Sequence, residues 1–282
     1  MSHVNQEAAN VSGETLGFSF GANWKKFLET VDEPIIAKAV QSFLDFTHLA
    51  RLDNYDFLDL GCGSGLSSLV ALRLGARRVV SIDIDPHSID CARALRKAQG
   101  ISEARWEIQH GSVLDEAFLE SLGRFSYVHS WGVLHHTGAM WPAVKNVVRH
   151  NVDEVGLLHL ALYNTTPTSA RWLTIKRLCN RSPRLLFPLL TKGYAGLLFL
   201  RMLTRGKSPI RYARDYRKVR GMSVMRDLDD WFGGLPYEHS TPDETVDFLA
   251  ERGYSLLRLK TTRSNGCNEF LFRAGGALRA GA

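Results

Sequence analysis

The sequence predicts an α/β fold, a doubly wound and mostly parallel sheet with helices on both faces. Between residues 55 and 163 short apolar runs alternate with stretches of helical periodicity, which is the pattern of successive βα units. A glycine-rich turn joins the first apolar run to the helical stretch after it. The chain has 282 residues, 45% of them hydrophobic, so one large domain, or one domain with an inserted piece, can bury a sizeable core.

The elements follow in order along the chain. Five strands are predicted, at residues 56–60, 78–82, 105–109, 127–130 and 156–163. Helical stretches lie between them, notably at residues 65–74, 86–99 and 141–150. Beyond residue 230 a helical segment precedes two strand-like runs, SLLRLKTT and NEFLFRA. These runs can close the sheet as a hairpin, which brings the expected total to seven strands.

The domain organisation is expected to have five parts. A change of character after the fifth strand marks an insertion, where apolar runs are broken by Pro188, Gly193 and Gly196 and surrounded by basic residues. The longest run is not expected to span a membrane, because Pro188, Lys192 and Arg201 interrupt it. The parts are an N-terminal helical flap (1–50), a nucleotide-binding core (51–164), a basic helical lid (165–230), a C-terminal completion of the sheet (231–273) and a flexible tail (274–282).

Composition and cysteine usage exclude several classes of protein. The charged fraction of 23% and the mean hydropathy of −0.13 exclude disordered, collagenous and polytopic membrane proteins. The four cysteines lie far apart, without a C-x-x-C pair, so neither a zinc site nor a disulfide framework is indicated. The opening segment is polar and does not resemble a secretory signal. We expect a cytoplasmic protein without a metal.

The positive charge is concentrated in the lid. The whole chain carries 35 Lys and Arg against 29 Asp and Glu, a net charge of +6. Residues 171–226 hold 15 of the basic residues and one acid, Asp215, a local charge of +14. The rest of the chain, with 20 basic and 28 acidic residues, carries −8. Such a segment suits an acidic acceptor, an anionic membrane surface or RNA, and it is equally compatible with a solvated helical face.

The most informative stretch is FLDLGCGSGLSSLVALRLGARRVVSIDID at residues 57–85. Gly61, Gly63 and Gly65 fall between an apolar strand and a helix, where glycine lets the backbone turn tightly and approach a ligand. Asp83 ends the next strand. A doubly wound sheet brings its carboxylate beside the glycine loop, within reach of a ribose diol. The alternative is a glycine-rich turn with a solvated aspartate.

The glycine spacing is G-x-G-x-G, and not the G-x-G-x-x-G of dinucleotide-binding folds. With Asp59 before it, DLGCGSG resembles the first motif of class I S-adenosylmethionine-dependent methyltransferases, and VVSIDIDP resembles the acidic segment that follows. The segments GFSFGANWKKF, SWGVLHHTGAMW, DWFGGLPYEHSTP and GCNEF resemble a bacterial subgroup acting on small molecules or surface-biosynthetic intermediates. The resemblance implies a Rossmann-like fold, S-adenosylmethionine as donor and S-adenosylhomocysteine as product.

The resemblance also implies how the donor is held. The three glycines approach its amino-acid and ribose parts, and Asp59 supports the loop or the amino group. Asp83 takes the ribose hydroxyls, and Ile84 flanks the adenine. Ser112 replaces an acidic residue that commonly meets the adenine amino group, so its hydroxyl or the backbone at Val113 would serve instead. The full implied set is Asp59, Gly61, Cys62, Gly63, Gly65, Asp83, Ile84, Ser112, Val113 and Ser130.

Methyl transfer is an in-line displacement that needs alignment and, for an alcohol or phenol, a deprotonating group. His135 and His136 directly follow the fourth strand, and one of them is a candidate base; alternatively, the pair caps the next helix or packs beneath the site. Tyr163 and Asn164 end the fifth strand, at the rim where open α/β sheets collect ligands. They are candidates for contacts with the acceptor, or an ordinary strand end and turn.

Further residues are candidates for binding the acceptor. Aromatic residues near the N-terminus suit a flap over the donor or a helix packed on the sheet. The segment WFGGLPYEH, residues 231–239, combines aromatic, glycine and polar residues in a turn that can line a pocket, although surface loops carry such residues routinely. The expected acceptor-binding residues are Phe20, Trp24, Trp131, Tyr237 and Glu238.

The expected function is methyl transfer to an O or N atom of a small-molecule, cell-surface or lipid-linked biosynthetic intermediate. One alternative is an RNA methyltransferase that uses the basic lid, although no separate RNA-binding module is recognisable. Another is a non-catalytic binding protein that retains the fold. The lid would also allow peripheral contact with a membrane.

Overall fold

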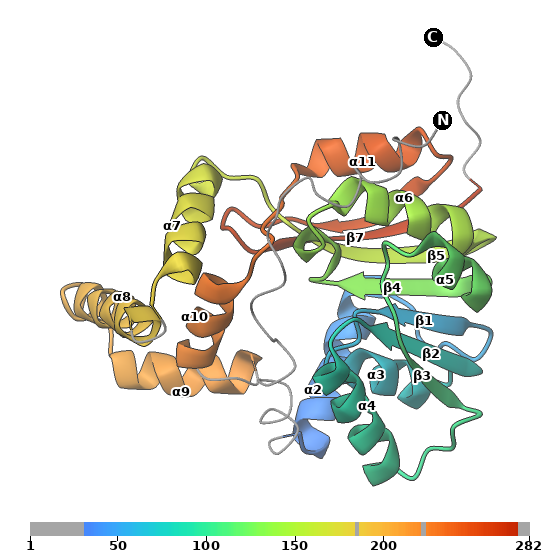
Figure 1. Cartoon of the computed structure of the whole chain (residues 1–282). Helices are drawn as coiled ribbons and strands as arrows, with labels where there is room; N and C mark the ends of the chain where they lie inside the picture. The colour runs from blue at the N-terminus through green and yellow to red at the C-terminus, as the bar shows by residue number, and fades with distance from the viewer. Residues whose placement is uncertain (1–30, 184–185, 221–223, 276–282) are drawn as a thin grey trace.

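The computed structural model describes residues 31–183, 186–220 and 224–275 of the chain. At its centre is a seven-stranded sheet with the order β3-β2-β1-β4-β5-β7-β6 (Figure 1). Strand β7 runs antiparallel to β5 and β6, and the other neighbours are parallel. The strands are β1 (Asp56–Leu60), β2 (Arg78–Asp83), β3 (Trp106–His110), β4 (Phe125–Trp131), β5 (Val152–Tyr163), β6 (Ser255–Lys260) and β7 (Cys267–Arg273).

This sheet confirms the predicted doubly wound α/β fold, including the closing hairpin. The central strands are apolar on both sides, as in β1, where Phe57 packs on one face and Leu58 on the other. Buried parallel strands read as continuous apolar runs for this reason. Strand β5 is longer than the predicted 156–163, because Asp153, Glu154 and Val155 at its start are not buried and do not follow the apolar pattern.

Helices cover both faces of the sheet. One face is covered by α2 (Glu33–Thr47), α3 (Leu66–Arg73) and α4 (Pro86–Ala98). The other is covered by α5 (Glu116–Leu122), α6 (Met140–His150) and α11 (Pro242–Ala250). Local caps determine where several of them begin: Asp85 accepts the His87 N–H before Pro86 starts α4, an arrangement that satisfies a free backbone donor.

The chain between β5 and α11 forms a helical lid beside the carboxyl edge of the sheet (Figure 1). This confirms the predicted insertion after the fifth strand. Aromatic rings join its helices, and Trp172 contacts Tyr194, Trp231 and Phe232 with ring centroids 5.2–5.8 Å apart. The lid helices are α7 (Ser169–Arg181), α8 (Leu186–Leu203), α9 (Pro209–Arg220) and α10 (Val224–Gly233).

The expectation that Pro188, Gly193 and Gly196 break the apolar run of the lid is wrong. Helix α8 runs through all three. Pro188 is its third residue, and in the first turn a backbone N–H has no partner within the helix, so proline is tolerated there. Among the described residues, α8 is the one helix that is long and apolar enough to cross a membrane by length and composition.

Two predicted parts of the chain lie mostly outside the described residues. The flap candidates Phe20 and Trp24 belong to the undescribed segment 1–30, and the end of the predicted tail lies beyond residue 275. The described end of the predicted flap is α2, whose Ile36, Phe43 and Phe46 are buried against the sheet.

Candidate active site

The loop between β1 and α3 lies at the carboxyl edge of the sheet, in the middle of the strand order. Gly61 and Cys62 donate their N–H groups to the Ile82 carbonyl, at 2.8 and 2.9 Å, which ties the loop to the end of β2. Gly63 donates its N–H to the Asp83 carboxylate at 2.9 Å. The predicted loop and the acid after it are thus in direct contact.

All three glycines of the loop have positive φ, at 74° for Gly61, 53° for Gly63 and 80° for Gly65. L-residues with a side chain rarely adopt this conformation. A Cβ on Gly61 would lie 2.4 Å from a methyl carbon of Val133, and one on Gly65 would lie 2.9 Å from the Trp106 ring. Protein packing therefore requires glycine at two of the positions, in addition to the approach of a ligand inferred from the sequence.

The Asp83 carboxylate is held by backbone donors on both of its oxygens. Oδ2 accepts the Gly63 N–H and Oδ1 accepts the Asp85 N–H, each at 2.9 Å. Burial raises the pKa of Asp83, and the two N–H bonds oppose that rise. Each carboxylate oxygen has a further lone pair, so the group can still accept hydrogen bonds from a ribose diol.

Asp59 is buried at the end of a chain of hydrogen bonds that the sequence did not reveal. Its carboxylate accepts the Ser68 hydroxyl at 2.5 Å. Since that hydroxyl has one proton, Ser81, 2.6 Å away, must donate to Ser68, and Ser81 accepts the Trp106 indole N–H at 2.7 Å. Burial raises the pKa of Asp59 to about 7, and the nearby Asp83 charge adds to the rise. These hydrogen bonds link β1, α3, β2 and β3 beneath the loop.

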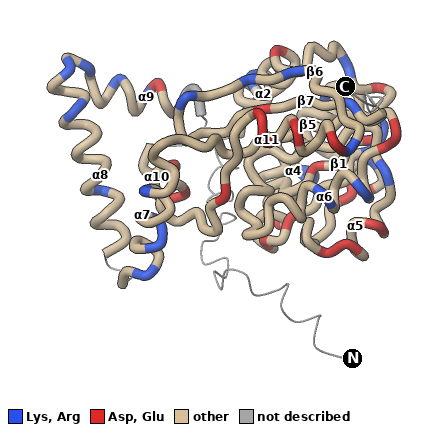
Figure 2. Tube along the Cα trace, turned by 90° about the horizontal axis from the view of Figure 1, so that it is seen from above, with Lys and Arg blue, Asp and Glu red and all other residues tan. Residues whose placement is uncertain are grey.

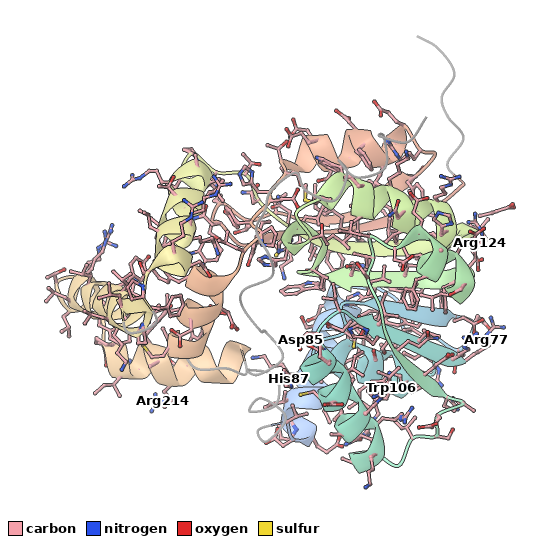
Figure 3. The ribbon with its side chains drawn as sticks, viewed as in Figure 1. Arg77, Asp85, His87, Trp106, Arg124 and Arg214 are labelled. Atoms are coloured by element: carbon pink, nitrogen blue, oxygen red, sulfur yellow. The ribbon has the colours of Figure 1, made fainter. Side chains whose placement is uncertain are left out.

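Large apolar side chains are exposed at the same edge, one after each of three strands. Ile84 after β2 is 48% exposed, Leu114 after β3 is 40% exposed, and Trp131 at the end of β4 is 47% exposed. In Figure 3, Asp85 and His87 mark this edge on the side of the lid, and Arg77 and Arg124 mark the opposite edge. Exposed apolar surface beside a positioned carboxylate suits a purine nucleoside, with one part apolar and the other rich in hydroxyls.

Several residues of the implied donor set have buried side chains. The Ser130 hydroxyl donates to the Leu60 carbonyl at 3.2 Å and is fully buried. Burial also raises the pKa of the Cys62 thiol well above its ordinary value. Val113 is buried, whereas Ser112 is partly exposed and accepts the Leu114 N–H at 3.2 Å. A contact between the donor and Cys62, Ser130 or Val113 would therefore come from the backbone.

His135 and His136 lie in a short 3₁₀ helix, η1 (Leu134–His136), just after β4. His135 Nδ1 accepts the Tyr163 N–H at 3.2 Å, so its proton is on Nε2. His136 Nδ1 lies 2.7 Å from the Pro236 carbonyl, which can only accept, so its proton is on Nδ1. Burial lowers the pKa of His135 well below its ordinary value and that of His136 to about 4. Both rings are neutral at physiological pH, and neither caps α6, whose N-cap is Ala139.

The last residue of β5, Tyr163, contributes its ring to the site, and the next residue, Asn164, makes structural contacts. The Tyr163 ring packs on His135 with centroids 3.8 Å apart and on Tyr237 with centroids 5.4 Å apart. The Asn164 side chain instead donates to the Thr262 carbonyl at 2.8 Å and accepts from Asn268 at 3.0 Å. Asn164 thus holds the β6–β7 turn against the core, and its side chain is used within the fold.

The segment between the lid and α11 crosses this edge of the sheet. Both carboxylate oxygens of Glu238 accept the Met140 N–H, at 3.0 and 3.1 Å, so Glu238 caps α6 from a distant part of the chain. Burial raises the pKa of Glu238. The Tyr237 ring is buried and lies near Tyr163 and Trp231. Of the two predicted acceptor contacts in this segment, Glu238 has a structural partner and Tyr237 packs among other aromatic rings.

Lys176 of α7 is a buried cation that sequence reasoning counted among the lid's outward charges. Its ammonium donates to the Trp231 and Gly234 carbonyls and lies 4.1 and 4.9 Å from the Trp231 and Tyr237 ring centroids. Burial lowers its pKa to about 7. The signal that could have found it is spacing, since Trp172, Lys176 and Cys179 recur every three or four residues and share one helix face.

Tyr163, Trp231 and Tyr237 pack with Lys176, His135 and His136 in one cluster, which we name the aromatic cluster. It joins the carboxyl edge of the sheet to α7 and α10 of the lid. Six ring contacts connect its members, with centroids 3.8–5.8 Å apart. The sheet supplies the histidines and Tyr163, and the lid side supplies the remaining members.

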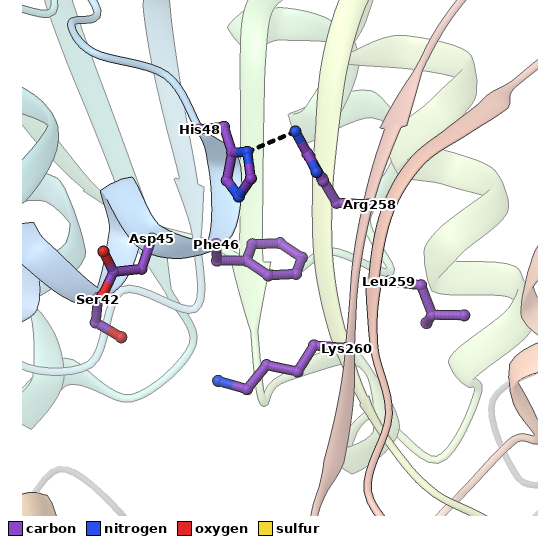
Figure 4. Close-up of a pocket in the computed structure, with 7 residues that line it drawn as sticks. All are labelled: Ser42, Asp45, Phe46, His48, Arg258, Leu259 and Lys260. Carbon is purple, nitrogen blue, oxygen red and sulfur yellow. Dashed lines mark hydrogen bonds between the residues drawn. The ribbon is translucent and has the colours of Figure 1, made fainter.

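A polar hollow and a buried polar pair lie away from this edge of the sheet. A hollow between α2 and β6 is lined by Asp45, His48 and Lys260 among others, and there His48 bonds to Arg258 (Figure 4). Glu269, on β7, accepts from His159 at 3.0 Å. Within the described residues no three His, Cys, Asp or Glu side chains are grouped closely enough to hold a metal ion.

Comparison with known proteins agrees with this geometry. Residues 57–152 match the family model described as "Methyltransferase domain". A ribosomal protein L11 methyltransferase from Hamiltonella defensa is 44% identical over 60 residues, which cover 21% of this chain and 20% of the relative. The chain thus aligns with about a fifth of that protein's length.

Two solved structures share the fold across most of the chain. Magnesium protoporphyrin IX methyltransferase from Synechocystis PCC 6803, with bound SAH, has a TM-score of 0.50 and 15% identity, and the match covers 85% of this chain and 81% of that one. PKMT2 from Rickettsia typhi, in complex with AdoHcy, has a TM-score of 0.56 and 14% identity, and the match covers 87% and 53%.

The matched domain covers residues 57–152, about a third of the chain, and contains the glycine loop with Asp83. Residues 57–152 match a methyltransferase domain, and the described chain has the fold of solved methyltransferase structures. The carboxyl-edge site has the carboxylate and the apolar surface that suit S-adenosylmethionine as the methyl donor.

Proposed function

We propose that this chain moves a methyl group from S-adenosylmethionine to an O or N atom of a small-molecule or lipid-linked intermediate of cell-surface biosynthesis, in the cytoplasm. The observation that carries the proposal is the aromatic cluster, which joins the donor edge of the sheet to the lid. Its rings favour an acceptor with an apolar or planar part. Its neutral histidines favour an acceptor that must lose a proton.

The chain's residues divide between the two reactants. Asp83 would accept the ribose hydroxyls, Ile84 would contact the adenine, and Trp131 would contact the acceptor. The bound donor supplies a methyl carbon made electrophilic by sulfonium. The aromatic cluster would orient the acceptor's lone pair toward that carbon, because in-line attack depends on alignment.

His136 is the candidate that would take the acceptor's proton. Its Nδ1–H is held by the Pro236 carbonyl, so Nε2 is the ring nitrogen without a proton. A pKa of about 4 keeps this nitrogen unprotonated at neutral pH but makes it a weak base, so it suits proton removal in concert with methyl transfer. Turnover should be level near neutral pH and fall as the pH approaches 4.

The direct test is incubation of the full chain with methyl-labelled S-adenosylmethionine and fractionated cell extract. Label in the small-molecule or lipid fraction supports the proposal. Label in RNA would instead support the alternative that the basic lid serves a nucleic-acid acceptor, with affinity falling steeply as salt rises. Label in protein, or in no fraction despite donor binding, would also overturn the proposal.

A pair of variants tests the assignment of His136. His136→Asn removes the base but retains a donor for the Pro236 carbonyl, and it should lower turnover by about 10²-fold or more with unchanged donor affinity. Asn164→Ala is the matched control, since its side chain binds the β6–β7 turn. Full turnover by His136→Asn would remove His136 from the mechanism.

A further inference from the structure

Helix α8 forms the side of the lid that faces away from the sheet (Figure 1). Its attached side is narrow: Thr191 and Ala195 are buried, and the Tyr194 ring packs on Trp172 and Phe232. These positions lie within about one quarter of the helix circumference at 100° per residue. The remaining circumference of α8 faces outward.

The outward face of α8 consists of leucines and glycines. Leu189, Leu197, Leu200 and Leu203 are 58–68% exposed, which is unusual because soluble proteins seldom expose large contiguous apolar patches. At 100° per residue, Gly193 and Gly196 fall on the same face. We name this surface the leucine face: Leu186, Leu189, Leu190, Gly193, Gly196, Leu197, Leu200 and Leu203.

Cations border the leucine face on both flanks and at one end. Lys192 and Arg201 project about 180° apart around the helix axis, one on each side of the face, and both are exposed. Exposed Arg205 and Lys207 follow the end of α8, and Arg211 and Arg214 continue along α9. Figure 2 shows basic residues spread over α7, α8 and α9.

We infer that the leucine face inserts into the surface of a bilayer that contains anionic phospholipids. Leucines would enter the acyl region, and flanking Lys and Arg side chains would reach the phosphate groups, as in amphipathic interfacial helices. Helix α8 is held against α7 and α10 along its attached side. Those contacts favour lying in the interface over crossing the bilayer, although 18 residues span about 27 Å.

Charge distinguishes this occupant from the others. A second copy of the chain would bring two segments of +14 together, and like charges oppose that contact. RNA would neutralise the cations but leave the leucines in water. An anionic bilayer would accommodate both the leucines and the cations. The rest of the chain, at −8, would be repelled from the same surface, so the lid would face the bilayer.

Vesicle co-sedimentation of the full chain, without donor or acceptor, tests this inference independently of the proposed methyl transfer. Vesicles of phosphatidylcholine with phosphatidylglycerol should bind the chain, and those of phosphatidylcholine alone should bind at least tenfold more weakly. The double variant Leu197→Glu/Leu200→Glu should lower binding about 30-fold or more. Val155→Glu is the matched control, since Val155 is 78% exposed on β5, and it should bind like the wild type.

A polarity-sensitive fluorophore separates insertion from adsorption by charge. Attached at Leu200→Cys it should shift to shorter wavelength with anionic vesicles, and attached at Val155→Cys it should not. Absence of wild-type binding, or unchanged binding by the double glutamate variant, would overturn the inference. So would a wild-type dimer in vesicle-free buffer that the double variant converts to monomer, because the leucine face would then be a contact between copies.

Discussion

Replacing Asp83 is the sharpest test of the donor site. Its carboxylate oxygens each accept one backbone N–H and keep a lone pair for the ribose. Hydrogen bonds to a charged group contribute about 1.5–3 kcal/mol each, so losing two of them costs about 3–6 kcal/mol of binding. Asp83→Ala should therefore raise the Kd for S-adenosylhomocysteine by about 10²- to 10⁴-fold. Asp83→Asn, which retains one acceptor oxygen, should fall between Ala and the wild type.

Calorimetric titration with S-adenosylhomocysteine measures these affinities, and thermal unfolding monitored by circular dichroism shows that each variant is folded. The matched control is Asp32→Ala, which removes a carboxylate that caps α2 by accepting the Ile35 N–H at 3.0 Å. It should lower the free energy of unfolding by about 1 kcal/mol without changing donor affinity. A folded Asp83→Ala protein with donor affinity within about threefold of the wild type would refute the ribose contact, since that is under 1 kcal/mol.

Two further predictions concern stability. Burial lowers the folded-state pKa of Lys176 from 10.5 to about 7. Between these two pH values the unfolded chain binds more protons than the folded chain. The free energy of unfolding should therefore rise with pH, by at most about 1.4 kcal/mol per pH unit. Denaturant unfolding across that window should show the rise in the wild type and lose it in Lys176→Met; an equal slope in both would contradict the assignment. Gly61→Ala places a Cβ 2.4 Å from Val133, whereas Gly132→Ala, at a similar φ of 79°, meets nothing within 4 Å. Both substitutions should lower the free energy of unfolding by about 1 kcal/mol because of the left-handed backbone. Gly61→Ala should lower it by about 1–3 kcal/mol more through overpacking. Equal melting temperatures of the two variants would argue against the Val133 contact.

The lid has two chemically different sides. Toward the sheet, α7 and α10 supply Lys176 and Trp231 to the aromatic cluster. Away from the sheet, α8 presents the leucine face. One insertion thus contributes residues to the proposed acceptor site and carries the proposed membrane contact. An acceptor with a lipid part would then approach the site from the surface on which the lid rests.

Local pattern was sufficient for the donor half of the molecule. Strand, glycine turn, helix and acid follow one another within residues 56–83, and their hydrogen bonds join neighbouring strands. Local structure of this kind can be predicted from hydrophobic periodicity and from turn residues. The same reasoning misjudged Pro188, because whether a proline interrupts a helix depends on its position within that helix.

The acceptor half depends on contacts between residues far apart in the chain. Glu238 caps α6 through Met140, Asn164 holds the Thr262 turn, and Lys176 reaches the carbonyls of Trp231 and Gly234. Glu238 and Asn164 were candidates for contacts with the acceptor, and Lys176 was counted only as a charge of the lid. Each has a structural partner 55 to 98 positions away that no local pattern specifies.

The sequence by itself determined the α/β class, the order of the elements, the glycine loop with Asp83 and the concentration of +14 in the lid. These properties follow from periodicity, turn residues and counts, which are local. Tertiary structure alone decided which of the lid's cations are buried, which face of α8 remains outward and which polar groups are already bonded. Burial and partner choice arise when distant segments pack together, and that packing turned one lysine inward while leaving the leucines of α8 exposed to solvent.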